Sequence, residues 1–438
     1  MRRVLVLGAG LVARPMVRYL LDYAEVVVAS RTKAKADELV RGHERGRSAE
    51  LVADDTASLH RFVAEADVVV SLLPYTHHVA VAKHCLELKK HLVTTSYVSE
   101  AMRALDVPAR AAGLLFLNEI GLDPGIDHMS AMAVIDGVRA RGGRVTSFES
   151  YCGGLPAPEA NDNPLGYKFS WSPRGVLMAG RNEARYLKDG QEVIVPGPEL
   201  FRRRWPIKVA DGFEFEAYPN RNSLPYIETY GLQGVRTMLR GTLRNSGWCE
   251  TLGAIVDLGL LGDDLVPGIE ALTVAGWVRA HVPRNSSLRR DVAEKLKLDE
   301  HHPVLDRLEW LGLFDERPVG LTQGSGIDIL TKLMLERMSY RPGERDMIVL
   351  HHRFEVEYSS SPAERIHSTL IDLGIPGGDS AMARTVSLPA AIAIRMLVEG
   401  RLNLAGVRVP VMRDIYEPVL AELERLGIVC REEKLPLG

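Results

Sequence analysis

The chain opens with a strand-like apolar run that leads directly into a glycine-rich turn. Residues 8–13 read GAGLVA, a Gly-x-Gly-x-x-Ala pattern placed immediately after the run. At a strand-to-helix junction, Gly8 allows the tight turn, Gly10 lets the backbone approach a pyrophosphate, and Ala13 permits close packing of helix on strand. The helix N-terminus adds free amides and the positive end of a dipole. We therefore predict a dinucleotide-binding turn formed by Gly8, Gly10, Leu11 and Val12.

The residues after the next predicted strand bear on the choice of dinucleotide. NAD enzymes usually carry an Asp or Glu here for the ribose hydroxyls. This chain has Ser30, Arg31 and Thr32 instead, and such donors suit a 2′-phosphate that a carboxylate would repel. We predict NADP(H) as the cofactor; the alternative is that Arg31 is a solvated loop charge. Leu73 and Pro74, at the end of a later strand, are expected along the adenine-to-ribose path.

Three further segments are unusually rich in groups that could contact a ligand. They read TTSYVS at 94–99, NEIGLDPGIDH at 118–128 and SYCGGLPAPE at 150–159. Each follows a predicted strand, and the carboxyl ends of parallel strands open onto the ligand crevice. The GGLP run at 153–156 is expected to form a loop that presents backbone groups.

Apolar runs of strand length alternate with helical spacing in the first third of the chain. The runs are Val4–Leu7, Val26–Ala29, Val68–Leu73, Leu92–Thr95 and Leu114–Leu117. Strands that are apolar on both faces and separated by helices predict an α/β fold with a doubly wound, Rossmann-type parallel sheet.

The pattern changes after Gly125 to one expected for a mixed α/β domain. A helix over Ser130–Ala140 precedes alternating runs that predict a mixed or antiparallel sheet, at Val145–Tyr151, Phe213–Tyr218 and Met347–Tyr358. Between about Val235 and Arg341 mainly helices are expected, at Glu250–Leu261, Leu265–Val282 and Leu305–Leu311. The apolar helix that begins at Leu388 and the amphipathic one over Ile415–Leu426 are expected to return to the first domain.

Composition narrows the class of protein. The 438 residues exceed the ~250–300 at which one core stops growing, and 46% apolar with 25% charged residues is typical of soluble globular chains. A net charge of −3 and short basic clusters predict no nucleic-acid partner. Arg14 ends the first apolar run too early for a membrane span of ~20 residues. Four scattered cysteines are expected to be reduced, which suits the cytoplasm.

Adjacent histidines occur three times, at 77–78, 301–302 and 351–352. No carboxylate or thiol with metal-ligand spacing accompanies them, so solvated or structural histidines are expected and no metal site is predicted.

The polar segments as a group, together with NDNPLGYKFSWSPRG at 161–175 and RGTLR at 240–244, resemble the glutamate-forming saccharopine reductases of the saccharopine dehydrogenase family. The resemblance covers nearly the whole chain, and the CGGLPAP and KFSWS runs are its most specific parts. It implies an NADP-binding Rossmann domain over 1–125 and 388–438, a substrate-binding and dimerisation domain over 126–234 and 342–387, and a helical insert over 235–341.

The resemblance also implies a reaction and its residues. NADPH would reduce the imine of L-2-aminoadipate 6-semialdehyde and L-glutamate to saccharopine, in a homodimeric enzyme. Because saccharopine carries three carboxylates, the planar forks of Arg221 and Arg244 are expected to act as clamps. The substrate contacts carried over by position are Ser96, Tyr97, Asp123, Arg221, Thr242, Leu243 and Arg244.

A proton must move at the reacting nitrogen, and Asp123, Tyr97 and Cys152 are the candidates, although no dyad is recognisable in the sequence. Two alternatives stay open. Another imine reductase of the superfamily, such as carboxynorspermidine dehydrogenase, would favour acidic groups for a polyamine. A nucleotide sensor without catalysis would have little use for the polar segments.

Overall fold

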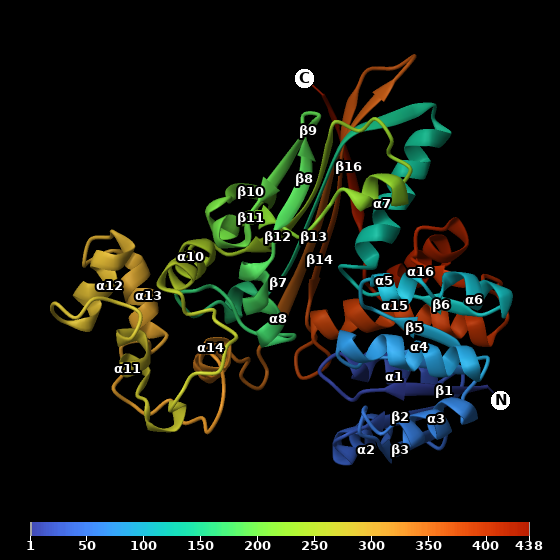
Figure 1. Cartoon of the computed structure of the whole chain (residues 1–438). Coiled ribbons are helices and arrows are strands. Elements are labelled where there is room, and N and C mark those ends of the chain that lie inside the picture. Colours follow the sequence, from blue (N-terminus) through green and yellow to red (C-terminus); the bar gives the residue numbers. More distant parts are fainter. Residues whose placement is uncertain (1, 438) are drawn as a thin grey trace. The chain divides into compact units, whose positions relative to one another are not determined.

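The computed structural model describes residues 2–437 and divides into two compact units (Figure 1). The first comprises Met1–Arg144, Glu357–Pro362 and Leu370–Glu433, and the second comprises Val145–Val356, Ala363–Thr369 and Lys434–Gly438. The domain boundaries inferred from the resemblance stay a prediction.

The first unit is built on a parallel sheet of seven strands, in the order β15-β6-β5-β4-β1-β2-β3. The strands are β1 (Arg3–Leu7), β2 (Glu25–Ser30), β3 (Gly46–Glu50), β4 (Val68–Ser71), β5 (His91–Thr94), β6 (Leu115–Leu117) and β15 (Gly406–Arg408). The chain runs from β1 outward to β3 and then returns to the other side of β1 as β4. The carboxyl ends of β1 and β4 therefore form the topological switch point, where ligands bind in such sheets.

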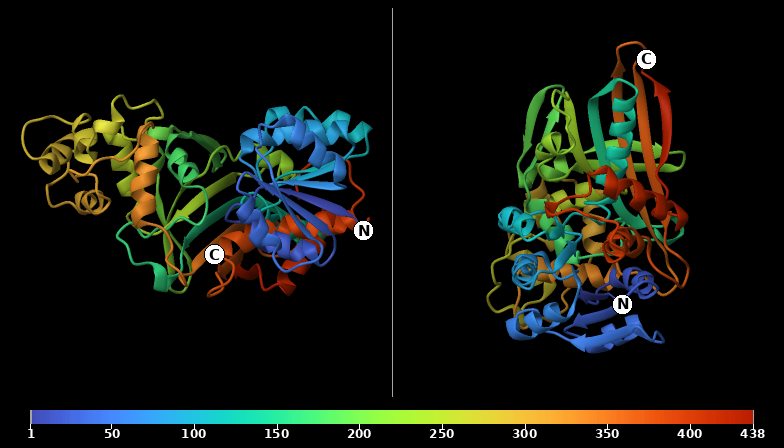
Figure 2. Two further views of the ribbon diagram at one scale, coloured as in Figure 1. Left: turned by 90° about the horizontal axis from the view of Figure 1, so that it is seen from below. Right: turned by 90° about the vertical axis from the view of Figure 1, so that its right-hand side faces the viewer.

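Helices cover both faces of this sheet, as the left view of Figure 2 shows. The helical elements of the first unit are α1 (Ala13–Leu21), α2 (Lys33–Val40), α3 (Thr56–Glu65), η1 (Tyr75–His77), α4 (His78–Glu87), α5 (Glu100–Arg103), α6 (Asp106–Ala111), α7 (Ile126–Ala140), α15 (Ala381–Val398) and α16 (Arg413–Arg425). On one face, α3 and α4 bury Val63 and Val81 against Leu5 and Val69 of the sheet. On the other face, α1 packs against α15. The predicted doubly wound α/β fold is confirmed.

Helix α15 begins earlier than its apolar sequence predicts. Ser380 caps it by accepting a hydrogen bond from the backbone N–H of Ala383 at 3.0 Å, so the helix starts at Ala381 rather than at Leu388. Pro389 lies inside it, where a helix usually loses one backbone hydrogen bond. Among the described residues α15 alone is long and apolar enough to span a membrane, but 72% of it is buried, as in a core helix.

The second unit is built on a mixed sheet of nine strands, with β10-β11-β12-β7-β13-β14-β16 along its main path and β8 joining β12 to β9. The strands are β7 (Gly143–Pro156), β8 (Ala184–Lys188), β9 (Gln191–Val195), β10 (Trp205–Ala210), β11 (Phe213–Pro219), β12 (Thr237–Arg244), β13 (Asp346–Tyr358), β14 (Glu364–Leu373) and β16 (Arg431–Pro436). Strands β7 and β12 are parallel, whereas β11 is antiparallel to β12 and to β10.

The GGLP run expected to form a loop is instead the buried end of β7. The loop prediction is wrong because Gly153 serves sheet packing: a Cβ at this position would lie 2.7 Å from the carbonyl oxygen of Leu243 on β12. Glycine thus lets the two parallel strands approach each other.

Helices dominate the second unit after β12. The segment predicted to be helical from about Val235 begins instead with this strand, and its helices follow. The helical elements of this unit are η2 (Pro158–Ala160), α8 (Pro173–Met178), η3 (Ala179–Arg181), η4 (Gly197–Arg202), α9 (Pro225–Thr229), α10 (Trp248–Leu258), η5 (Ile269–Ala271), α11 (Val274–Arg279), α12 (Leu288–Leu296), α13 (Pro303–Trp310) and α14 (Gly326–Arg337). The continuous helix predicted over Leu265–Val282 is wrong, because Gly268 has a left-handed backbone and Leu272 is extended.

Candidate active site

The glycine turn lies at the switch point of the first sheet. The backbone N–H of Gly8 donates to the carbonyl of Ala29 at 2.8 Å, and its φ of +109° favours glycine. A Cβ on Gly8 would lie 3.1 Å from the carbonyl oxygen of Leu72, so the turn is held between the ends of β2 and β4. Gly10 differs, because a Cβ there would meet no atom within 4 Å. No contact among residues 2–437 requires glycine at position 10, whereas a closely bound pyrophosphate would.

The N-terminus of α1 is prepared for an anion. Its N-cap residue, Val12, makes no side-chain cap, and the first turn carries no acidic residue. The amides of this turn are therefore left without side-chain acceptors, which is the arrangement that binds phosphate. Leu11 beside them is 73% exposed.

Ser30, Arg31 and Thr32 lie where β2 ends and α2 begins. Arg31 is exposed and forms no ion pair with any acidic group of residues 2–437. Thr32 is the N-cap of α2 without a side-chain cap, and its backbone N–H donates to the Ser30 hydroxyl at 3.4 Å. The guanidinium and the threonine hydroxyl thus fit a 2′-phosphate. Leu73 is half-buried and Pro74 is exposed, directly after β4.

Ser96 is held by a buried histidine. His78, at the start of α4 and 4% exposed, contacts the Ser71 hydroxyl through Nδ1 at 2.8 Å. Its Nε2 lies 2.8 Å from the Ser96 hydroxyl and 3.2 Å from that of Thr94. Burial lowers the pKa of His78 to about 4, so the ring is neutral near pH 7 and can both donate and accept. It therefore fixes the Ser96 hydroxyl at the carboxyl end of β5.

Tyr97 and Asp123, both candidates for proton transfer, lie together. The Tyr97 hydroxyl donates a hydrogen bond to Asp123 Oδ1 at 3.0 Å, and both residues are half-buried. Asp123 is presented by a tight loop in which a Cβ on Gly125 would lie 2.0 Å from the Gly121 carbonyl oxygen. The pair forms a dyad that the sequence did not reveal, because 26 residues separate its members.

Glu119 clamps the segment that carries Ser96 and Tyr97. Its backbone N–H donates to the Ser96 carbonyl at 3.1 Å, and its Oε1 accepts from the backbone N–H of Val98 at 2.9 Å. Its Oε2 lies 2.9 Å from Nε2 of the fully buried His128 on α7. Glu119 has a left-handed φ of +56°, a strained conformation that these contacts stabilise.

In the second unit, strand register brings four more predicted residues together. Thr242 on β12 pairs with Cys152 on β7 and with Tyr218 on β11. Leu243 and Arg244 follow Thr242 on the same strand. Cys152 and Leu243 are buried, whereas Thr242 is half-buried. Arg221 lies apart from this register, in an exposed turn after β11 with a left-handed φ of +53°.

Arg244 is a buried cation in an aromatic cage. It is 4% exposed, and its guanidinium carbon lies 4.8, 5.5 and 6.0 Å from the ring centres of Tyr167, Trp248 and Tyr218. Its Nη1 donates to the Leu243 carbonyl at 2.7 Å, but its Nε has no partner. The Tyr167 hydroxyl and Trp248 Nε1 are likewise buried without a hydrogen bond.

No carboxylate of residues 2–437 forms an ion pair with Arg244. Its cross-strand partner Glu216 instead accepts from the backbone N–H of Cys249 at 2.6 Å and lies 3.6 Å from Arg204. Burial acts to lower the pKa of Arg244, but Tyr218 and Tyr167 raise it, so the group stays charged. A buried charge without a counter-ion is costly, and its own Nε together with the two neighbouring donors, the Tyr167 hydroxyl and Trp248 Nε1, would suit an anionic ligand.

Several of these residues were missed or set aside from the sequence. Trp248 lies four residues after Arg244, but Tyr167 is far from both along the chain, and only the fold brings all three side chains together. His78 stands out in the sequence only as part of a histidine pair, and its position shortly after the end of β4 is the signal that could have indicated its role. His351 is also buried, and burial lowers its pKa to about 3.

The glycine turn, the switch point and the unpaired Arg31 define a dinucleotide-binding protein of the Rossmann class. Two family models match nearly the whole chain: the saccharopine dehydrogenase NADP binding domain over residues 4–117, and the saccharopine dehydrogenase C-terminal domain over residues 121–428. The chain belongs to the saccharopine dehydrogenase family.

Similar proteins agree with this assignment. A Pyricularia oryzae protein named saccharopine dehydrogenase [NADP(+), L-glutamate-forming] is 42% identical, over 99% of both chains. The solved structure of apo saccharopine dehydrogenase (L-Glu forming) from Saccharomyces cerevisiae matches with a TM-score of 0.90 and 39% identity, over 99% of this chain and 100% of that one. The mitochondrial alpha-aminoadipic semialdehyde synthase of Bos taurus is 39% identical over 98% of this chain, which spans 47% of that protein.

Proposed function

We propose that this chain is an NADP(H)-dependent saccharopine dehydrogenase of the glutamate-forming type, an enzyme of lysine metabolism. It catalyses the reversible reduction of the imine formed from L-2-aminoadipate 6-semialdehyde and L-glutamate, which gives L-saccharopine. Family membership supports the assignment, and the observation that carries it is the buried guanidinium of Arg244, which forms no ion pair within residues 2–437. NADPH supplies the hydride that the imine carbon receives.

The cofactor residues of the first unit have separate tasks. The turn at Gly8 and Gly10 and the amides that begin α1 hold the pyrophosphate, with Leu11 and Val12 beside it. Arg31, aided by Ser30 and Thr32, binds the 2′-phosphate, and this contact favours NADP(H) over NAD(H). Leu73 and Pro74 line the path of the nucleotide.

Substrate binding rests on carboxylate recognition. Arg244 receives one carboxylate of saccharopine, and the Tyr167 hydroxyl and Trp248 Nε1 are placed to donate to the same group. We assign a second carboxylate to Arg221 and further contacts to Ser96, Thr242 and Leu243. A buried cation does not suit a polyamine, so the carboxynorspermidine alternative is disfavoured.

Proton transfer is assigned to Tyr97 and Asp123. When the imine is reduced, its carbon accepts a hydride and its nitrogen must end with one proton more than the neutral imine holds. The Tyr97–Asp123 hydrogen bond offers a donor and a carboxylate within 3.0 Å of each other, an arrangement able to relay that proton. Cys152, buried in β7, stays the alternative for this role.

We also propose a cytoplasmic homodimer. The absence of a disulfide among the four cysteines suits a reducing compartment. The second sheet ends in β10 and β16, and such edge strands present backbone groups that a second copy can pair. Sedimentation velocity would separate a dimer from a monomer.

The proposed function is tested by mixing purified protein with saccharopine and NADP⁺. Reduced nicotinamide and L-glutamate should appear in equal amounts, and NAD⁺ should serve less well. A chain that binds NADPH but turns over no saccharopine would be a nucleotide sensor or an enzyme with another substrate.

A further inference from the structure

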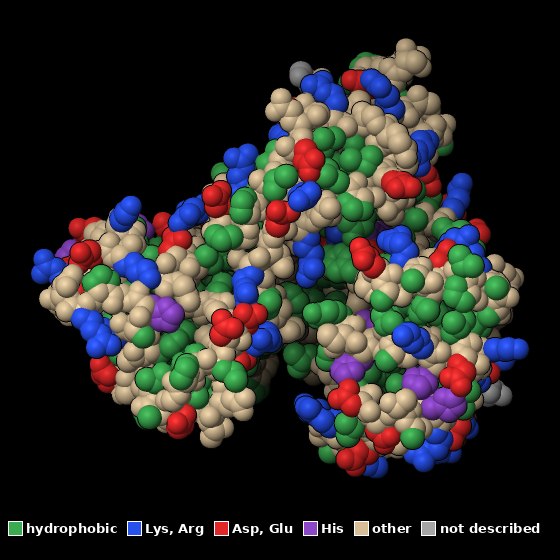
Figure 3. Space-filling model, in the orientation of Figure 1, with side chains coloured by type: hydrophobic (Ala, Val, Ile, Leu, Met, Phe, Trp, Pro, Cys, Tyr) green, Lys and Arg blue, Asp and Glu red, His purple; other side chains and the backbone are tan. Residues whose placement is uncertain are grey.

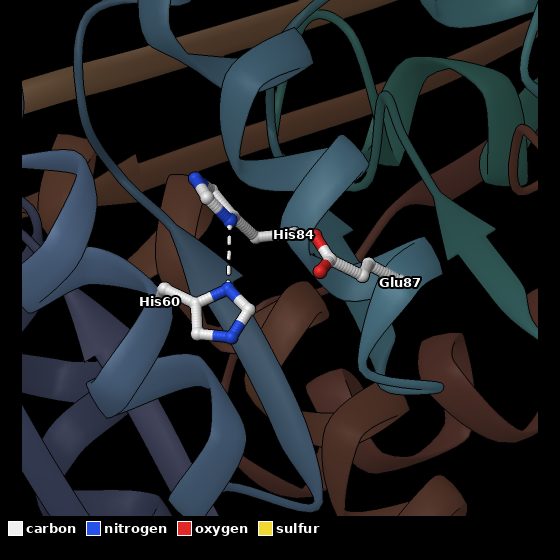
Figure 4. A group of neighbouring side chains, drawn as sticks. All are labelled: His60, His84 and Glu87. Carbon is white, nitrogen blue, oxygen red and sulfur yellow. Dashed lines mark hydrogen bonds between the residues drawn. The ribbon is translucent and has the colours of Figure 1, made fainter.

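Two histidines and a glutamate that no step of the reaction uses come together on the first unit. His60 lies on α3, and His84 and Glu87 lie on the last turns of α4 (Figure 4). One ligand atom from each falls within 4.8 Å of the other two. The histidines are half-buried and Glu87 is exposed, on a face where histidine side chains gather over α3 and α4 (Figure 3).

The two imidazoles face each other through the same kind of nitrogen. Their Nδ1 atoms are 3.3 Å apart, so a hydrogen bond between them needs one ring as its Nδ1–H tautomer. If both rings carry the proton on Nε2, two lone pairs point at each other and need a cation between them. Neutral imidazole nitrogen is the common protein ligand for transition metals.

The spacing of the two nitrogens fits a tetrahedral ion. At Zn–N distances of about 2.0–2.1 Å, two ligands of a tetrahedral ion lie about 3.3–3.4 Å apart, which agrees with the 3.3 Å found here. Glu87 follows His84 by three residues and therefore shares its face of α4. Glu87 forms no ion pair within residues 2–437, so its carboxylate is available as a third ligand.

We propose that His60, His84 and Glu87 bind one Zn²⁺ ion, with water completing its coordination. His84 lies six residues after His78 on α4, about 9 Å along the helix axis and away from the Ser96 hydroxyl. The ion touches no reacting group. It ties α3 to α4, which β4 and η1 separate along the chain, and so stabilises the first unit. The sequence-based expectation of no metal considered only adjacent histidines.

Isothermal titration of the full-length chain with ZnCl₂ tests the proposal. Wild type should bind one equivalent, and saturating Zn²⁺ should raise the melting temperature. His60→Gln and His84→Gln should each weaken binding by roughly tenfold or more, because each removes one of three ligands. His301→Gln is the matched control, since it makes the same change at an exposed histidine outside the cluster. Mg²⁺, which prefers oxygen ligands, should not bind here.

Two further readouts keep the test decisive. Co²⁺ should give the absorption of a tetrahedral ion without a thiolate charge-transfer band, which separates this site from the cysteines. Glu87→Gln, a change at an exposed position, serves if a histidine variant does not fold. Wild type without saturable Zn²⁺ binding, or histidine variants that bind as tightly as His301→Gln, would overturn the proposal.

Discussion

The Tyr97 hydroxyl donates a hydrogen bond to the Asp123 carboxylate at 3.0 Å, and this contact joins the loop after β5 to the tight loop before α7. Glu119 and His78 hold the neighbouring backbone and the Ser96 hydroxyl. The backbone on both sides of Tyr97 is thus held by groups that are themselves buried and hydrogen-bonded.

Asp123→Asn and Tyr97→Phe should both lower kcat for saccharopine, by roughly 10²–10⁴ for the residue that transfers the proton. NADPH affinity should stay near the wild-type value, because neither side chain is assigned to the cofactor. If the two residues act as one unit, the double variant should lose little more than the worse single variant. Unchanged kcat in both single variants would move the role to Cys152.

Arg31→Ala should weaken NADPH binding by roughly 1.5–3 kcal/mol, the contribution of a charge-assisted phosphate contact, and leave NADH nearly unaffected. Fluorescence titration with each cofactor measures both. Arg41→Ala, at another exposed arginine of the first unit, is the control and should change neither. Equal losses for the two cofactors would show that Arg31 does not read the phosphate.

His78 should make stability depend on pH. Its pKa is about 4 in the folded chain and 6.5 as a reference, so the unfolded chain binds the proton more readily and stability falls as pH drops below 6.5. Because the unfolded chain takes up this proton first, His78 alone should lower the unfolding free energy by about 2 kcal/mol when the pH falls from about 7 to about 5. Urea unfolding of His78→Gln should show a decline smaller by that amount. An identical pH profile in the variant would contradict the neutral, buried state.

Gly153→Ala should destabilise the chain by roughly 1–3 kcal/mol, because the added Cβ would lie 2.7 Å from the Leu243 carbonyl oxygen. Gly137→Ala is the matched control: it lies in α7, and its Cβ meets nothing within 4 Å. That change should gain roughly 0.5–1 kcal/mol from helix propensity. Denaturant unfolding measures the stability of both variants. Equal effects would show that the close approach of β7 to β12 at Gly153 does not require glycine.

The parallel sheet was largely predictable because its central strands are short apolar runs. β1, β2, β4, β5 and β6 all lie within a residue or two of the predicted runs. The edge strand β3 has the polar sequence GRSAE, and β15 has only three residues, so neither carries the apolar signal. Hydrogen bonding to a neighbouring strand, rather than local sequence, makes them strands.

The candidate site was predictable only in part. The sequence could indicate Arg244 as a candidate. Its aromatic cage, and its lack of a counter-ion within residues 2–437, follow only from tertiary packing. Likewise, Tyr97 with Asp123 and His60 with His84 are pairs separated by many residues along the chain. The GGLP run was misjudged because glycine suits both a loop and a close approach of two strands.

We propose that the buried guanidinium of Arg244 binds a substrate carboxylate. Steady-state kinetics of Arg244→Lys with saccharopine test it most directly, since lysine keeps the charge but loses the bidentate fork. We expect the KM for saccharopine to rise by roughly tenfold or more with a near-normal Kd for NADPH, while the exposed Arg236→Lys behaves as wild type. Wild-type KM and kcat in a folded Arg244→Lys variant would contradict the account.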